Sequence, residues 1–191
     1  ADKSVSVHWS ETAKEETAGS VENNCFFACE KRDEHGMIQK LRQKRRTGRM
    51  KQRIIFATGN KNKIREIHEI LGDLGWEILS MKEAGIDLDI VEDGTTFEEN
   101  ALIKAKAVAA QCNDIVLADD SGLEIDYLNK EPGIYSARYA GEDTSYDIKN
   151  QMLLDRLQGV PREKRTARFV CAIAAVVPGH EPIVVRGTIE G

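Results

Sequence analysis

The chain has 191 residues, of which 41% are hydrophobic and 31% are charged, and its formal net charge is −5 at pH 7. These values are typical of one soluble globular domain with an appendage. The sequence contains no apolar run long enough for a membrane span, and its polar, acidic N-terminus is unlike a secretory signal. We therefore expect a cytoplasmic protein with reduced cysteines and no contact with a membrane.

The first 49 residues differ from the rest of the chain. They show no sustained helical or strand period, and their content of Glu, Ser, Thr, Asn and Lys favours disorder. Met50 is followed by an apolar strand, as at the natural start of a cytosolic domain. We therefore predict a disordered or non-native extension over residues 1–49 and a folded domain over residues 50–191.

A basic run lies in front of this domain, at Lys40, Arg42, Lys44, Arg45 and Arg46. Such a run could contact nucleic acid or act as a localisation signal. A solvated linker is the favoured interpretation, because basic runs are common in disordered tails. Residues 54–191 are acidic overall, and we expect no specific binding of nucleic acid.

From Ile54 onwards the apolar pattern predicts an alternation of strands and helices. The predicted strands lie at residues 54–57, 76–79, 115–118, 165–177 and 183–187. Leu123, Ile125 and Tyr127 alternate as a possible continuation or partner of the third strand. The predicted helices lie near residues 62–74, 96–112 and 145–158. The second helix carries a stripe of Ala101, Ala105, Val108 and Cys112, which we interpret as core. Capping residues mark the helix starts: Asn60, Thr96 in a capping box with Glu99, and Thr144 or Ser145. A turn at Pro178 and Gly179 makes the last two strands an antiparallel hairpin. The prediction is an α/β fold with a mixed sheet and helices packed on it.

The third strand is the most informative, because it ends in the sequence Asp119-Asp120-Ser121-Gly122. Side chains alternate along a strand, so the two carboxylates should point in different directions. Open α/β sheets bind ligands at the carboxyl ends of their strands. Two adjacent charges are costly unless a cation or a proton offsets them, which makes a divalent metal and phosphate chemistry the first hypothesis. Taken alone, the four residues favour an ordinary turn or helix cap.

Two further segments add to this hypothesis. Residues 58–63 lie between a strand and a helix, where backbone N–H groups and the lysines could bind an anion, or form an ordinary capped turn. Glu92 and Asp93 precede the next helix as metal ligands or as partners of its dipole. Lys104 shares a helix face with Asn100 and could neutralise phosphate, or be an exposed lysine.

A loop bounded by Pro132 and Gly141 carries Arg138 and two tyrosines. Arg138 could bind a phosphate, or could pin the loop by pairing with an acid, and the structural role is slightly favoured.

Four segments in this order resemble the Ham1/inosine triphosphate pyrophosphatase family, and above all its bacterial members that act on non-canonical purine nucleotides. The resemblance runs from about residue 54 to residue 191. The segments are Ala57-Thr58-Gly59-Asn60-x-x-Lys63, Glu92-x-Gly94-x-Thr96-Phe97-x-Glu99-Asn100-Ala101, Ala118-Asp119-Asp120-Ser121-Gly122-Leu123 and Pro132-Gly133-Ile134-Tyr135-Ser136-Ala137-Arg138-Tyr139.

The resemblance implies a Mg²⁺-dependent homodimeric hydrolase that converts ITP, dITP and XTP to the monophosphate and pyrophosphate. It implies that Asp120 is the proton acceptor and, with Glu92, a metal ligand, although Asp93 is adjacent to Glu92. The implied substrate-binding residues are Thr58, Gly59, Asn60, Lys61, Asn62, Lys63, Lys104 and Ser121. Such enzymes keep deaminated purines out of nucleic acid.

The chain departs from the family pattern at its end. Family members continue with a Gly-Phe-Gly-Tyr-Asp segment, a later lysine and a Ser-His-Arg segment, none of which occurs in this sequence. We therefore expect that residues 50–191 form an incomplete domain with weakened base selection. The alternative function is a receiver-like signalling domain, which also combines paired aspartates, Mg²⁺ and a lysine but has no pyrophosphatase activity.

Overall fold

The computed structural model describes residues 52–72 and 75–191. The predictions for residues 1–49, for the basic run and for Met50 lie outside these residues. No helix in the described part of the chain is long and apolar enough to cross a membrane.

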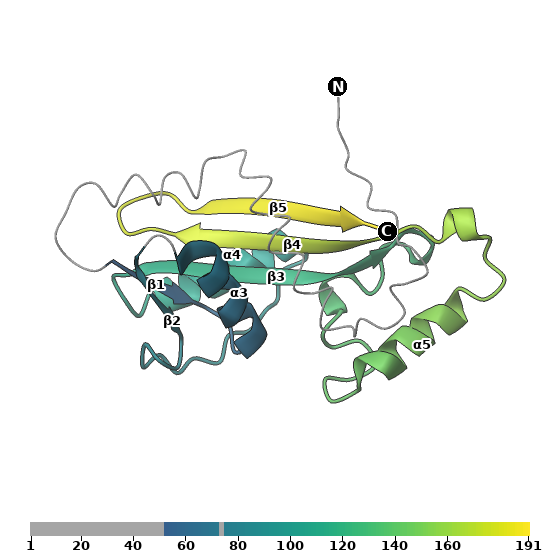
Figure 1. The fold of residues 1–191 in the computed structure, drawn as a ribbon, viewed down its shortest axis with the longest axis horizontal. Coiled ribbons are helices and arrows are strands. Elements are labelled where there is room, and N and C mark those ends of the chain that lie inside the picture. The colour runs from purple at the N-terminus through teal and green to yellow at the C-terminus, as the bar shows by residue number, and fades with distance from the viewer. Residues whose placement is uncertain (1–51, 73–74) are drawn as a thin grey trace, which may run out of the picture.

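The domain is built on one five-stranded sheet with the strand order β2-β1-β3-β4-β5 (Figure 1). The strands are β1 (Arg53–Phe56), β2 (Glu77–Ser80), β3 (Ile115–Ile125), β4 (Ala167–Val176) and β5 (Ile183–Glu190). β1 runs parallel to both β2 and β3, whereas β4 is antiparallel to β3 and to β5. The predicted mixed sheet and its C-terminal hairpin are therefore confirmed.

Three α-helices and three short 3-10 helices connect these strands. The α-helices are α3 (Lys61–Leu71), α4 (Phe97–Ala109) and α5 (Tyr146–Arg156), and the 3-10 helices are Asp126–Leu128, Gly133–Tyr135 and Arg162–Lys164. The predicted caps are confirmed for α3 and α4, where the side chains of Asn60 and Thr96 accept hydrogen bonds from the N–H groups of Asn62 and Glu99. At α5 the cap is Ser145, one of the two residues predicted.

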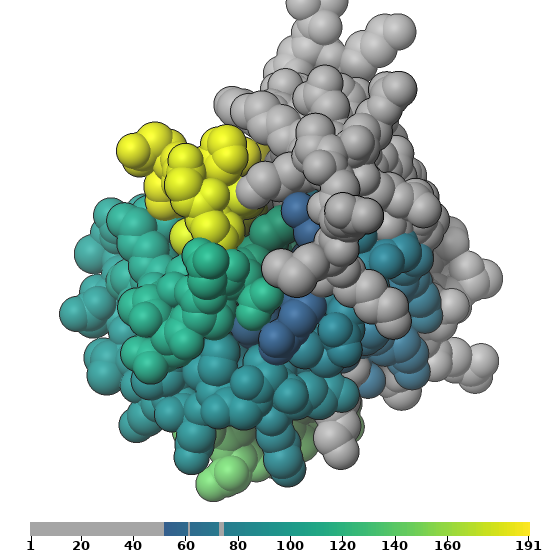
Figure 2. Space-filling view, turned by 90° about the vertical axis from the view of Figure 1, so that its left-hand side faces the viewer, coloured from purple at the N-terminus to yellow at the C-terminus, as the bar shows by residue number. Residues whose placement is uncertain are grey.

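Helices α3 and α4 cover opposite faces of the sheet (Figure 1). Alternate side chains of β3 point to opposite faces and contribute to both apolar layers. Ile115 and Leu117 belong to the cluster that includes the apolar side chains of α3. Val116 and Ala118 belong to the cluster that includes α4. The predicted core stripe of α4 is confirmed at Ala101, Ala105 and Val108, which are fully buried. Its fourth predicted member, Cys112, lies beyond the end of α4 and is only partly buried. Figure 2 shows the end of the sheet at which β1 begins, where blue residues are visible among teal residues, below the yellow β4–β5 turn.

Strand β3 does not end at the aspartate pair. The sequence left residues 123–127 as a continuation or a partner of this strand, and the structure shows a continuation to Ile125, with the pair in the middle of the strand. Tyr127 lies in the 3-10 helix that follows. The strand continues because it has a second neighbour, β4. β1 pairs with β3 only as far as Leu117, whereas β4 pairs with β3 from Val116 to Ile125. The aspartates therefore lie beyond the carboxyl end of β1 but inside the antiparallel half of the sheet.

Helix α5 packs around the distal end of β3, in a separate apolar cluster with Ile125 and Leu128 (Figure 1). The segment 132–141 packs against β3 beyond the aspartate pair. Ser136 Oγ accepts a hydrogen bond from the N–H of Leu123 at 2.9 Å. A Cβ atom on Gly122 would lie 2.5 Å from the carbonyl oxygen of Gly133, so only glycine permits this close approach.

Candidate active site

One side of β3 carries an ion pair between Lys63 and Asp119. The two residues are 56 positions apart in the chain, yet Lys63 Nζ lies 2.5 Å from Asp119 Oδ2 and 3.0 Å from Ser121 Oγ. The pairing follows from the alternation of the strand, because Asp119 and Ser121 share the face of β3 that meets α3. Only 3% of Asp119 is exposed, so its charge needs this cation.

The other side of β3 carries Asp120, which faces α4. Its Oδ2 accepts a hydrogen bond from Asn100 Nδ2 at 3.2 Å, and its Oδ1 accepts one from the N–H of Ser121 at 3.1 Å. Lys104 Nζ lies 3.7 Å from Asp120 Oδ1. The prediction that the two aspartates point in different directions is confirmed, because each contacts a different lysine from a different helix.

Burial raises the pKa of the Asp120 carboxyl above its ordinary value, although nearby Lys104 and the hydrogen bond from Asn100 act to lower it. The negative charges of Glu92 and Asp119 raise this pKa further. A raised pKa makes a carboxylate a stronger proton acceptor than an exposed one.

Glu92 completes this side of the site. Its Oε2 lies 2.8 Å from Lys104 Nζ, so Glu92 and Asp120 both lie beside the same ammonium group. Asp93, the adjacent acid, is exposed. Sequence reasoning left the two acids as alternatives, and it is Glu92 that the structure places beside Lys104.

The carboxylates fit the requirements of Mg²⁺. This ion commonly takes one or two protein carboxylates and completes its octahedral shell with water and phosphate oxygens. Within residues 52–72 and 75–191, no three His, Cys, Asp or Glu side chains are grouped as a metal cage. Glu92 and Asp120 already share a cation in the form of the Lys104 ammonium group, so both side chains can face one positive charge.

The loop after β1 leads directly into α3. Thr58 Oγ1 accepts a hydrogen bond from the N–H of Asn60 at 3.2 Å, and Asn60 Oδ1 accepts one from the N–H of Asn62 at 2.9 Å. Gly59 and Asn60 are exposed. A Cβ atom on Gly59 would meet nothing within 4 Å, which leaves open space beside this backbone for a ligand. The side chain of Lys61 lies outside the described residues.

The loop 132–141 does not bring Arg138 to the aspartate pair, as the phosphate-binding hypothesis for this residue would require. Arg138 is exposed, and its guanidinium group lies over the ring of Tyr135, 5.4 Å from the centroid. The loop is held instead by Lys149, a buried residue of α5 whose Nζ donates to the carbonyl oxygen of Ala137 at 2.6 Å. The pinning role predicted for Arg138 is thus performed at this point by Lys149.

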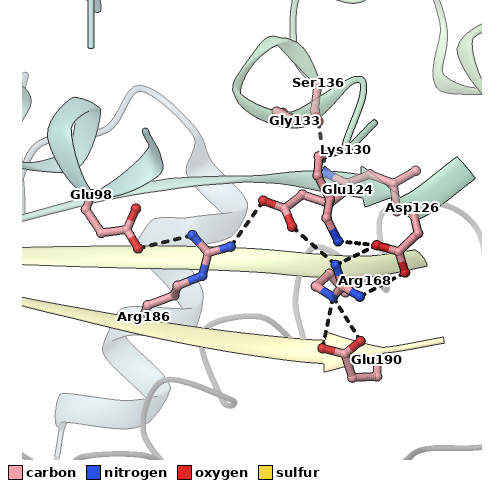
Figure 3. A network of polar contacts seen from close by, with 10 residues as sticks. Glu98, Glu124, Asp126, Lys130, Gly133, Ser136, Arg168, Arg186 and Glu190 are labelled. Carbon is pink, nitrogen blue, oxygen red and sulfur yellow. Dashed lines mark hydrogen bonds and ion pairs between the residues drawn. The ribbon is translucent and has the colours of Figure 1, made fainter. Parts of the chain in front are cut away.

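A network of ion pairs lies next to the site, and the sequence did not predict it (Figure 3). Arg168 of β4 contacts Glu124, Asp126 and Glu190, and Arg186 of β5 contacts both Glu124 and a residue of α4, Glu98. Hydrogen bonds from Lys130, Thr166 and Arg168 hold the pKa of Asp126 far below its ordinary value. The network ties β3, β4 and β5 to one another and to the start of α4.

Asn100 is the polar residue at the site whose role sequence reasoning missed. It was placed on the same helix face as Lys104 but given no function. One feature of the sequence could have indicated this role: Asn100 is a polar residue at a position of α4 that is otherwise part of its small, apolar stripe. The structure shows it 1% exposed, in contact with Asp120.

Comparisons with known proteins give a consistent result. Residues 54–191 match the model of the Ham1 family. The dITP/XTP pyrophosphatase of Bacillus subtilis (strain 168) is 49% identical over 137 residues, which cover 72% of this chain and 69% of that protein. The dITP/XTP pyrophosphatase of Clostridium perfringens is 48% identical over 145 residues, covering 73% of this chain and 71% of that protein.

Solved structures agree with the sequence relatives. The Staphylococcus aureus Ham1 protein superposes with a TM-score of 0.67 at 43% identity, covering 73% of this chain and 71% of that chain. A HAM1 protein from Coxiella burnetii also superposes with a TM-score of 0.67, at 38% identity, covering 73% of this chain and 72% of that chain.

Proposed function

Because the chain belongs to the Ham1 family, we propose that it is a nucleoside triphosphate pyrophosphatase that acts on dITP, ITP and XTP. In this reaction water attacks phosphorus, the phosphoanhydride bond between the α- and β-phosphates breaks, and the products are the nucleoside monophosphate and pyrophosphate. Such an activity removes deaminated purine nucleotides before they enter nucleic acid. The names of relatives at 48–49% identity support this substrate class.

One observation carries the proposal: two lysines and three acids from four separate segments lie together around residues 119–121 of β3. A triphosphate brings several negative charges, and ammonium groups at fixed positions stabilise the charge that develops as the anhydride bond breaks. Lys63 and Lys104 provide such groups. The Oγ of Ser121, 3.0 Å from Lys63 Nζ, provides a hydrogen-bonding group for the substrate beside them.

Asp120 is the proposed proton acceptor. Its carboxylate is positioned by Asn100 and by the N–H of Ser121, and burial keeps its pKa above the ordinary value. A carboxylate in this state can orient a water molecule and take its proton as the water attacks. Asp119 does not share this role, because its charge is matched by Lys63 on the other side of the strand.

Glu92 and Asp120 are the proposed ligands of Mg²⁺. A divalent cation bound there offsets the charge of the phosphates and polarises the reacting group. The Lys104 ammonium group, which lies beside both carboxylates, would then be available to phosphate oxygens. The segment Thr58, Gly59, Asn60, Lys61, Asn62 and Lys63 is the proposed contact for the rest of the nucleotide, because it combines exposed backbone with the start of α3.

The receiver-like alternative is not supported. Doubly wound domains of that kind have an all-parallel sheet, whereas β4 and β5 are antiparallel to their neighbours. The homodimer, the cytoplasmic location and the division into residues 1–49 and 50–191 stay predictions.

The products of the reaction test the proposal. We expect the protein with Mg²⁺ to convert XTP to XMP and pyrophosphate, observed directly by phosphorus nuclear magnetic resonance. Chelation of the metal should abolish the conversion. Release of inorganic phosphate and a nucleoside diphosphate would show a different bond being broken, and no turnover of XTP, dITP or ITP would contradict the function.

A further inference from the structure

Asn100 is a buried polar side chain with two partners, both of which belong to the site. Its Nδ2 donates to Asp120 Oδ2 at 3.2 Å, and its Oδ1 accepts from the N–H of Gly94 at 2.9 Å. Its residue is 1% exposed. A buried amide is expected to satisfy both of its polar atoms, and these two contacts do so.

The two contacts fix a single orientation of the amide. The backbone N–H of Gly94 can only donate, so the atom that faces it must be the oxygen. An ionised carboxylate can only accept, so the atom that faces Asp120 must be the nitrogen. The amide therefore favours the ionised form of Asp120, in agreement with the lowering of its pKa by this hydrogen bond. Neither an apolar nor an acidic side chain can make both contacts.

Gly94 extends this link to Glu92. A Cβ atom on Gly94 would lie 2.6 Å from Asn100 Oδ1 and 2.8 Å from Glu99 Cβ, so the segment before α4 approaches the helix as closely as a glycine permits. Glu92 lies two residues earlier and pairs with Lys104, one helical turn after Asn100. The segment 92–94 is thus attached to two successive turns of α4.

We propose that Asn100 is a positioning residue for the reaction, an inference that rests on the proposed function. Its amide orients the carboxylate of Asp120 so that Oδ1 faces Lys104, and it holds the segment 92–94 so that Glu92 faces the same cation. One side chain therefore sets the relative position of the two acids. Asn100 does not touch the substrate and acts only through Asp120 and Gly94.

Two substitutions test the proposal. Asn100→Ala removes the amide, and Asn100→Leu removes it while filling the space between helix and sheet. We expect kcat for XTP to fall about 10- to 100-fold in both variants, with KM within about threefold of the wild-type value. The affinity of the nucleotide-free protein for Mg²⁺, measured by isothermal titration calorimetry, should fall by a factor in the same range.

Leu153→Ala is the matched control, because Leu153 is buried in the α5 cluster, away from Asp120. It should lower the melting temperature but leave kcat and Mg²⁺ affinity within about twofold of wild type. Folded Asn100 variants that keep kcat and Mg²⁺ affinity within twofold of wild type would overturn the proposal. Losses of kcat and Mg²⁺ affinity no larger than those of Leu153→Ala at the same drop in melting temperature would also overturn it. An inactive wild-type protein would contradict the proposed function instead, and the calorimetric comparison would still decide the role of Asn100.

Discussion

At the scale of single residues, Asp119 and Asp120 are neighbours with different surroundings. Asp119 is almost fully buried and forms a direct ion pair with Lys63, which neutralises its charge. Asp120 receives two hydrogen bonds and has Lys104 at 3.7 Å, and burial raises its pKa. The strand alternation that separates them therefore assigns a supporting role to one carboxylate and leaves the other able to accept a proton.

Asp120→Asn should lower kcat for XTP by about 10²- to 10⁴-fold, because the amide cannot accept the proton of the attacking water. Steady-state kinetics would measure the loss, and circular dichroism would show that the variant is folded. Asp143→Asn, the same change at an exposed position, should leave kcat unchanged. A variant at Asp120 with wild-type turnover would remove this residue from the mechanism.

Lys63→Met should reduce both stability and activity. It leaves the buried carboxylate of Asp119 without its cation, and we expect a loss of about 3 kcal/mol in the free energy of unfolding. In the double variant Lys63→Met with Asp119→Asn, no unpaired charge remains, so most of the stability should return while turnover stays low. Denaturant unfolding and kinetics on the wild type and these two variants would measure this. Recovery of both quantities together would mean that Lys63 serves folding alone.

At the scale of secondary-structure elements, the site depends on a strand that belongs to two kinds of sheet. The first three residues of β3 pair with β1 in parallel, and its remaining length continues in antiparallel pairing with β4. The polar residues begin where β1 has ended. Past them, Arg168 and Arg186 hold β3, β4 and β5 together through Glu124, Asp126 and Glu190 (Figure 3).

Asp126→Asn tests the contribution of this network to stability. Because the pKa of Asp126 in the folded protein lies below that of the unfolded chain, its carboxylate stabilises the fold above about pH 4. That contribution is lost as the pH falls toward the folded-state pKa. We expect the variant to lose about 1 kcal/mol at pH 7 and the difference from wild type to shrink below pH 4. A difference that stays constant from pH 7 to pH 3 would contradict this.

The sequence predicted these elements well where the signal was local. The caps at Asn60 and Thr96 and the stripe of Ala101, Ala105 and Val108 depend on residues close together in the chain. The end of β3 was left open between a continuation and a separate strand, because its length is set by pairing with β4, which lies about 50 residues later. Asn100 and Arg168 were missed for the same reason, since their meaning depends on partners from distant segments.

At the scale of the whole molecule, the fold and the family agree with the chemistry of the site. The chain superposes on Ham1 proteins with TM-scores of 0.67, and residues 54–191 match the family model. Within that fold, α3 supplies Lys63 from one face of the sheet and α4 supplies Asn100 and Lys104 from the other. The site therefore combines one lysine from each of the two helical layers.

The most direct test of this account is the ratio of kcat/KM for XTP and dITP to that for ATP and GTP, measured as pyrophosphate release in the presence of Mg²⁺. We expect the protein to hydrolyse XTP and dITP at least about tenfold more efficiently than ATP and GTP, a difference of about 1.4 kcal/mol in transition-state binding. Equal efficiency with all four nucleotides, or no release of pyrophosphate from any of them, would contradict it.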